Sequence, residues 1–247
     1  MRLSPATAIT FSMNDTVAKF TDVDGDDVVV KTSKGKFDSA NPANNFTFAG
    51  QQLQVLNLKF AKFAGAQPKA IIRLGWEMNL SSMGWFAKDH EADYIAAFRR
   101  VVGIFRRHSS GFRYDWCPGW GPQDTPADGA YPGDDVVDYI GLDVYDYKYE
   151  GSPQERWQAF YLKAPFGLEW HRDFAAAHGK LMSYPEWGVG NIGDNPFFVQ
   201  QMHDWFVKNQ ANIAYAAYFD VDGLWPTQID NDQFPKSREL FRKLFSR

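Results

Sequence analysis

The 247-residue chain contains little cysteine, no long apolar run and no excess of basic residues. Its single cysteine, Cys117, has no partner in the chain, which excludes a scaffold built on internal disulfides. No apolar run reaches the roughly 20 residues that a membrane-spanning helix needs. The net charge is -4 and the lysines and arginines are scattered, so no basic surface is expected for a phosphate backbone. We therefore expect no membrane and no nucleic acid among the partners.

Histidine is also scarce, and the five histidines lack the paired spacing of a metal site. The acidic run at residues 22–27 does not fit a calcium loop, because the sixth and twelfth positions are Asp27 and Ser33 rather than Gly and Glu. The glycines form no Gly-x-Gly-x-x-Gly fingerprint at the start of a helix. We therefore expect neither a metal ion nor a nucleotide cofactor.

Aromatic residues, by contrast, are plentiful: nine Trp, 11 Tyr and 21 Phe make up 17% of the chain. This is more than a core of this size requires. A flat apolar face with a polar rim suits the face of a sugar ring, although it also suits a large hydrophobic core. The composition is thus compatible with a carbohydrate ligand without requiring one.

After residue 50, helix-period stretches alternate with short runs rich in β-branched and aromatic residues. The runs are apolar on both faces, which is typical of parallel strands covered by helices. Strands are predicted at Ala70–Glu77, Phe112–Cys117, Tyr139–Tyr145, Leu181–Trp187 and Ile213–Phe219. Helices are predicted at Gly50–Ala64, His90–Arg107, Gln154–His178 and Pro196–Asn209. Repeated strand and helix units predict an α/β fold.

Residues 1–49 have a different pattern. A strand is predicted at Ala8–Met13, and Asp24-Gly25 between apolar residues indicates a hairpin. Residues 39–45, rich in Asn, Pro and Ser, indicate a loop. No linker is long enough to divide the chain, so we expect a single domain over residues 1–247.

Two of the predicted strands end in glutamate, at Glu77 and Glu186. In a parallel α/β fold the carboxyl ends of the strands converge on one face, where chemistry is usually found. Each acid alone could instead cap a helix or form a structural salt bridge. Two facing carboxyl groups, however, are what the cleavage of a glycosidic bond requires.

Four stretches of the sequence resemble glycoside hydrolase family 26, the bacterial β-mannanase family of a large (β/α)8 clan: residues 71–79, 112–121, 137–145 and 183–188. The resemblance covers roughly residues 50–245. It implies an acid/base glutamate at the end of the fourth strand and a nucleophile at the end of the seventh. Glu77 and Glu186 match these two positions, and the predicted strands between them fill the fifth and sixth places.

The same resemblance extends to side chains around the two acids. Arg73 and Asn79 match an arginine and the Glu-Met-Asn run of the family, and Tyr145 matches a tyrosine that hydrogen-bonds the nucleophile. We therefore expect Glu77, Glu186 and Tyr145 to be catalytic. Glu77 is expected to be neutral, because burial and the nearby anionic Glu186 both raise its pKa. Glu186 is expected to be ionised, held by Tyr145 and Arg73, and to attack the anomeric carbon with net retention.

The sequence departs from the family in two places. Trp76 stands where mannan-active members usually have histidine, so the polymer is left open. Only one predicted strand precedes the strand that bears Glu77, whereas the family has three. We therefore predict a (β/α)8 TIM-barrel type fold whose first two βα units are not recognisable, unless residues 14–49 supply replacements or the sequence is truncated.

Nine residues are expected to bind substrate: Arg73, Trp76, Asn79, Trp85, Trp116, Trp120, Asp143, Trp187 and Trp225. Among the tryptophans, Trp85, Trp120 and Trp225 are favoured as sugar contacts because each lies in a loop beside Gly or Pro; the others could equally pack the barrel. Asp143, like Asp115 and Asp146, could bind sugar hydroxyls or support Arg73. Cys117 is interpreted as a small buried hydrophobic residue.

The sequence thus predicts a retaining, endo-acting glycoside hydrolase that cleaves a β-linked polysaccharide, of β-mannan type by resemblance. The alternatives are β-1,3-xylan, mixed-linkage β-glucan or a bacterial exopolysaccharide as substrate, or a barrel that binds polysaccharide without cleaving it. The substrate class suggests an extracellular or periplasmic location, although the first 16 residues contain no signal peptide. The oligomeric state is left open.

Overall fold

A computed structural model describes residues 66–147, 150–190, 193–222 and 226–245, together with the backbone of three short strands before them. The chain divides into two compact units, residues 1–68 with 108–110 and residues 69–107 with 111–247. The predicted helix at 50–64, the loop at 39–45 and the acidic run at 22–26 lie outside the described residues. The single domain over residues 1–247 stays a prediction.

The first unit contains a three-stranded antiparallel sheet in the order β1-β2-β3. Its strands are β1 (Ser12–Met13), β2 (Val17–Thr21) and β3 (Asp27–Lys31). Thr21 pairs with Asp27, so the hairpin predicted around Asp24-Gly25 is confirmed. Of the strand predicted at Ala8–Met13, only the last two residues are described as strand.

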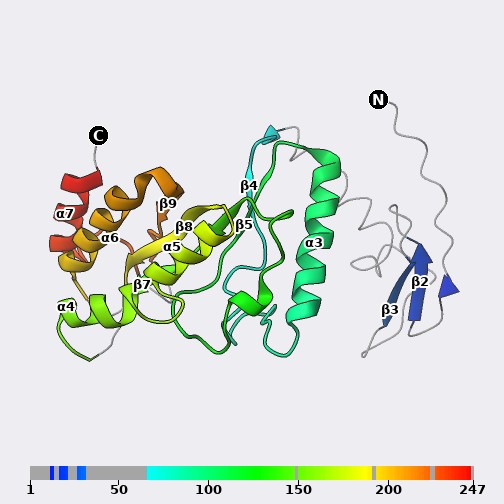
Figure 1. Ribbon diagram of the computed structural model, residues 1–247, viewed down its shortest axis with the longest axis horizontal. Coiled ribbons are helices and arrows are strands. Elements are labelled where there is room, and N and C mark those ends of the chain that lie inside the picture. The colour runs from blue at the N-terminus through cyan, green and yellow to red at the C-terminus, as the bar shows by residue number, and fades with distance from the viewer. Residues whose placement is uncertain are drawn as a thin grey trace. The chain divides into compact units, whose positions relative to one another are not determined.

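The second unit is built on a curled sheet in which every pair of strands is parallel (Figure 1). Its strands are β4 (Ile71–Arg73), β5 (Arg113–Trp116), β6 (Tyr139–Gly141), β7 (Val144–Asp146), β8 (Leu181–Val189) and β9 (Ile213–Tyr218). β6 and β7 pair with successive parts of β8, so together they form one interrupted strand. Within the described residues, β4 pairs only with β5 and β9 only with β8. The sheet confirms the expected incomplete (β/α)8 barrel.

Helices connect and cover these strands. They are α3 (Glu91–His108), the short η1 (Asp128–Ala130), α4 (Pro153–Arg156), η2 (Trp157–Leu162), α5 (Leu168–Ala177), α6 (Pro196–Asn209), η3 (Gln210–Asn212) and α7 (Pro235–Phe245). Asn195 caps α6 by accepting a hydrogen bond from the backbone N–H of Phe198, and Pro196 follows at the first turn. None of the helices in the described residues is long and apolar enough to cross a membrane.

The single helix predicted at Gln154–His178 is wrong, because the structure has three helical segments there. The chain turns at Phe166, whose φ of 57° lies in the left-handed region. Gly167 follows, and a Cβ there would lie 2.8 Å from the Tyr161 carbonyl oxygen. A side chain at Gly167 would therefore clash with the backbone that ends η2.

Two predicted strands also differ from the structure at their carboxyl ends. β4 ends at Arg73, and the chain then turns through Gly75 and Glu77, with φ values of 51° and 53°. The strand predicted at Tyr139–Tyr145 is interrupted at Leu142 and Asp143, because the Asp143 N–H donates to the Pro118 carbonyl oxygen rather than to β8. Both departures place polar side chains at the carboxyl edge of the sheet.

Candidate active site

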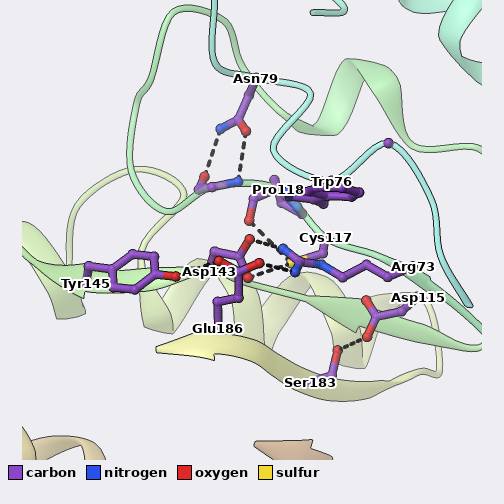
Figure 2. Close-up of polar contacts among 12 residues, drawn as sticks. Arg73, Trp76, Asn79, Asp115, Cys117, Pro118, Asp143, Tyr145, Ser183 and Glu186 are labelled. Atoms are coloured by element: carbon purple, nitrogen blue, oxygen red, sulfur yellow. Dashed lines mark hydrogen bonds and ion pairs between the residues drawn. The ribbon is translucent and has the colours of Figure 1, made fainter. Parts of the chain in front are cut away.

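Arg73 lies at the centre of a charged cluster at the carboxyl ends of the strands (Figure 2). Its guanidinium group donates one hydrogen bond to Glu186 Oε1 and another to Asp143 Oδ2. The Asp143 side chain is fully buried, whereas those of Arg73 and Glu186 are each 18% exposed. Arg73 therefore links a buried aspartate to a glutamate that solvent can still reach.

Tyr145 holds the other oxygen of Glu186. Its hydroxyl group donates to Glu186 Oε2 at 2.5 Å, which is the hydrogen bond expected from the sequence. Burial raises the pKa of Tyr145, and the negative charge of Glu186 raises it further, so this hydroxyl keeps its proton. Each carboxylate oxygen of Glu186 thus accepts one hydrogen bond, which suits an ionised group held in a fixed orientation.

An irregularity in β8 turns Glu186 toward Arg73. The pairing of β8 with β9 shifts register between Tyr184 and Trp187. Because a regular strand alternates its faces, Ser183 and Glu186, three residues apart, would point to opposite sides without this shift. Pro185 lies inside the irregularity and has no N–H to give to the neighbouring strand. It is the sequence signal from which the shift could have been predicted.

Glu77 lies in the turn after β4, where its backbone N–H donates to the Cys117 carbonyl oxygen at 2.7 Å. Burial raises the pKa of Glu77 to about 7, with a further contribution from the negative charge of Glu186 and partial compensation by Arg73. Its φ of 53° is unfavourable for a residue with a side chain, at a cost of about 1 kcal/mol. Near neutral pH the Glu77 carboxyl group is therefore about half protonated, and it lies within electrostatic range of Glu186, which is held by hydrogen-bond donors.

The raised pKa of Glu77 predicts a pH-dependent gain in stability when its charge is removed. In the unfolded chain this carboxyl group ionises near 4.5 and in the folded protein near 7, so the wild type loses stability as pH rises through that interval. Glu77→Gln is therefore expected to be more stable than wild type at pH 8, by at most about 3 kcal/mol. Urea unfolding at pH 4 and pH 8 measures this. An equal difference at both pH values would contradict the shift.

Asn79 and Asp143, both expected to bind substrate, are fully or almost fully buried. The Asn79 side-chain amide donates to the Gly119 carbonyl oxygen at 2.8 Å, and its oxygen accepts the Gly119 N–H at 2.9 Å. Asp143 is paired with Arg73 and with the Cys117 thiol. In these contacts Asn79 holds the loop after β5 and Asp143 holds Arg73, while a role of either residue in binding substrate stays a prediction.

Trp76 and Trp85 form an aromatic pair beside Arg73. Their ring centroids are 4.8 Å apart, and the Trp85 indole N–H donates to the Trp76 carbonyl oxygen at 2.6 Å. The Arg73 guanidinium lies 5.3 Å from the centroid of the Trp76 ring. Trp85 is 39% exposed, so its ring is available to a ligand. In the sequence it follows shortly after Glu77.

Three other tryptophans expected at the substrate are buried. Trp116 packs against Tyr131 and Phe174, and Trp187 lies among aromatic residues of α6 and α7. Trp120 is 4% exposed, and its indole N–H donates to the Phe160 carbonyl oxygen at 2.8 Å. Their burial does not support substrate contacts at these three positions, which stay predictions. Trp225 lies outside the described residues.

Cys117 has a polar contact that its apolar surroundings in the sequence do not indicate. It is buried as expected, but its sulfur lies 3.2 Å from Asp143 Oδ1. Burial raises the pKa of the Cys117 thiol, and the negative charge of Asp143 raises it further, so the thiol can donate to that carboxylate. The alternation of β5, which places Cys117 on the same face as Asp115, could have indicated this polar role. In the described part of the chain, no group of three or more His, Cys, Asp and Glu residues could hold a metal ion.

No protein-family model matches the sequence. A stretch of 72 residues, 27% of this chain, is 39% identical to Endoglucanase H of Acetivibrio thermocellus, of which it covers 8%. The solved catalytic domain of a GH26 endo-β-1,4-mannanase from Bacillus sp. JAMB-750 matches 85% of this chain, with a TM-score of 0.54 and 20% identity. A modular endo-β-1,4-mannanase of glycoside hydrolase family 26 from Cellulomonas fimi matches 87%, with a TM-score of 0.54 and 21% identity.

The chain spans only part of these two structures, 62% of the first and 51% of the second. The resemblance to glycoside hydrolase family 26 that the motifs indicate is therefore also found in the fold. The sequence identity to these structures is only about one fifth. The described part of the chain has the fold of the GH26 endo-β-1,4-mannanases, as an incomplete (β/α)8 barrel.

Proposed function

We propose that the protein is a retaining, endo-acting glycoside hydrolase that cleaves a β-linked polysaccharide. One observation carries the proposal: two carboxyl groups share a site but have different surroundings. The pKa of Glu77 is raised to about 7 by burial and by the charge of Glu186, whereas Glu186 accepts hydrogen bonds from Arg73 and Tyr145. Such a pair can supply one group as a proton donor and the other as a nucleophile.

In the first step, a Glu186 carboxylate oxygen attacks the anomeric carbon while Glu77 donates its proton to the glycosidic oxygen. The bond between that carbon and the oxygen breaks, and the leaving saccharide departs with a new hydroxyl group. The sugar is left as an ester on Glu186. Arg73 and Tyr145 orient the attacking carboxylate and are expected to stabilise its negative charge before attack.

In the second step, Glu77, now ionised, accepts a proton from water as the water oxygen attacks the same carbon. The bond to Glu186 breaks and the carboxylate is regenerated. Two inversions at one carbon give net retention of configuration. Because Glu77 alternates between acid and base, a pKa near 7 suits both roles at neutral pH.

The first polymer to test is a β-1,4-mannan, because the matching GH26 structures from Bacillus sp. JAMB-750 and Cellulomonas fimi are named endo-β-1,4-mannanases. A β-glucan should be tested as well, since the 72-residue stretch of higher identity matches a protein named Endoglucanase H. The test is reducing-sugar release from mannan, glucomannan, β-1,3-xylan, lichenan, carboxymethylcellulose and bacterial exopolysaccharides. Product is expected from wild type and not from Glu77→Gln or Glu186→Gln. Retardation of the folded protein in a polysaccharide gel with no product would contradict hydrolysis and favour binding alone.

Trp85 is expected to stack on a sugar of the substrate. Trp85→Ala should raise KM for the polymer by about tenfold, because an aromatic contact contributes roughly 0.5–1.5 kcal/mol beyond the area that it buries. Trp85→Phe keeps a ring, so its KM should lie between those of wild type and Trp85→Ala. Trp170→Ala on α5 is a control, since Trp170 stacks on Phe174 of the same helix. Unchanged KM in Trp85→Ala would exclude the contact.

A further inference from the structure

Asp115 is a fully buried carboxyl group on β5 that the two proposed catalytic steps do not use. Its Oδ2 atom accepts a hydrogen bond from the Ser183 hydroxyl group at 2.6 Å and another from the Tyr215 hydroxyl group. Figure 2 shows Asp115 and Ser183 pointing toward each other from β5 and β8. One oxygen atom therefore joins three strands, β5, β8 and β9.

These strands are not all neighbours, because β6 lies between β5 and β8 in the sheet. The side chain of Asp115 crosses β6 at Gly141. A Cβ atom at Gly141 would lie 2.6 Å from Asp115 Oδ1 and 2.7 Å from Cys117 Cβ. Only a residue without a side chain leaves room for this bridge, so Gly141 and Asp115 depend on each other.

The bridge ends next to the irregularity that orients Glu186. Ser183 and Tyr215 are register partners across β8 and β9, and the pairing is irregular on both sides of them, between Met182 and Ser183 and again after Tyr184. A slip of one residue at this point would turn Glu186 toward the helices and away from Arg73. Asp115 thus holds Ser183, in the part of β8 just before this irregularity. The register of that part decides where Glu186 points.

A carboxyl group in this position is energetically unfavourable for the fold. Burial raises the pKa of Asp115 to about 6, although the hydrogen bonds from Ser183 and Tyr215 partly offset this. Its Oδ1 atom accepts no hydrogen bond from any residue that the structure describes. An apolar side chain would avoid both penalties, so packing alone does not account for Asp115.

We propose that Asp115 is a positioning residue for Glu186. By accepting the Ser183 and Tyr215 hydroxyl groups across Gly141, it fixes the register of β8 and β9 immediately before the irregularity that turns Glu186 toward Arg73. The inference rests on the proposed function, because it concerns the nucleophile of that reaction. It goes further because it makes the orientation of that nucleophile depend on three residues outside the reaction, Asp115, Ser183 and Tyr215.

The test compares variants that remove one hydroxyl group from β8 or β9. Ser183→Ala and Tyr215→Phe each remove a donor to Asp115. Tyr184→Phe is the matched control, because Tyr184 is adjacent to Ser183 but its hydroxyl group faces the helices, where the Trp205 indole N–H donates to it at 2.6 Å. All three should lower the melting temperature. Steady-state kinetics use the polymer that wild type cleaves and a 2,4-dinitrophenyl β-glycoside of the same sugar.

Ser183→Ala and Tyr215→Phe are each expected to lower kcat about tenfold with KM within twofold, as for a misplaced nucleophile. The double variant should fall little further, because both hydroxyl groups act through one oxygen atom. Asp115→Asn keeps an acceptor oxygen and should retain at least a third of wild-type kcat, whereas Asp115→Ala should match the double variant. Tyr184→Phe should keep wild-type kcat.

Two results would overturn this inference alone: kcat of Ser183→Ala and Tyr215→Phe equal to that of Tyr184→Phe in an active protein, or Asp115→Asn as impaired as Asp115→Ala. A folded wild-type protein with no activity on any polymer or aryl glycoside would overturn the proposed function and this inference with it. The two failures are therefore distinguishable by the wild-type measurement.

Discussion

Glu186→Ala is expected to lose about four orders of magnitude in kcat, equivalent to roughly 5 kcal/mol of barrier. The proposed reaction has no other group that can form the glycosyl ester, since the neighbouring Asp143 is fully buried and bound to Arg73 and Cys117. Loss of Glu186 therefore removes covalent catalysis altogether, whereas loss of a binding residue removes only part of the substrate affinity.

The fold is expected to survive this change. Arg73 keeps its pairing with Asp143 when Glu186 is removed, so no buried charge is left without a partner. Circular dichroism and thermal unfolding should match wild type within a few degrees. Glu239→Ala, an exposed glutamate on α7, is the control for loss of a carboxylate and should keep full activity.

Chemical rescue would identify the role of Glu186. Azide added to Glu186→Ala with a 2,4-dinitrophenyl β-glycoside can enter the space of the missing carboxylate and attack the anomeric carbon directly. One inversion then gives the α-glycosyl azide. Near-normal hydrolysis by Glu186→Ala, or a β-azide product, would contradict its assignment as the nucleophile.

Much of the sheet could be predicted because its strands consist mostly of apolar and aromatic residues, although only β5 to β8 are mostly buried and β9 is not. The predicted bounds of β5, β8 and β9 lie within about two residues of the observed ones, and those of α6 agree at both ends, because Asn195 and Pro196 mark its start. α7 was not predicted, although it supplies Phe241 and Phe245 to the aromatic cluster around Trp187.

Periodicity alone does not give the orientation of side chains at the site, because the strand geometry there is locally irregular. A regular β8 would have placed Trp187 on the inner face and Glu186 on the outer face. The irregularity at Pro185 reverses both, so that Glu186 contacts Arg73 and Trp187 packs against α6 and α7. The motif marked the position of this glutamate in the sequence, but periodicity alone does not show which tryptophans are buried.

The second large effect is expected at Glu77, and it should depend on the leaving group. Glu77→Ala should lower kcat on the polymer about a thousandfold, within the range for loss of a general acid. The first step with a 2,4-dinitrophenyl β-glycoside should be nearly unaffected, because dinitrophenolate leaves without protonation. The ester on Glu186 should then accumulate, because the second step lacks its base. A burst of dinitrophenolate followed by slow turnover is the expected kinetic trace.

Azide and pH distinguish Glu77 from a residue that only binds substrate. Azide needs no base, so it should restore turnover of the Glu77→Ala ester and give the β-glycosyl azide, opposite in configuration to the product from Glu186→Ala. Wild-type kcat/KM for the polymer should fall as pH rises through about 7, where Glu77 loses its proton, and this fall should be missing from the residual activity of Glu77→Ala on the same polymer. Equal impairment on polymer and aryl glycoside, with no burst, would contradict the role as acid/base. Since the two azide products have opposite configurations, the pair of rescues tests both glutamates by stereochemistry rather than by loss of activity alone.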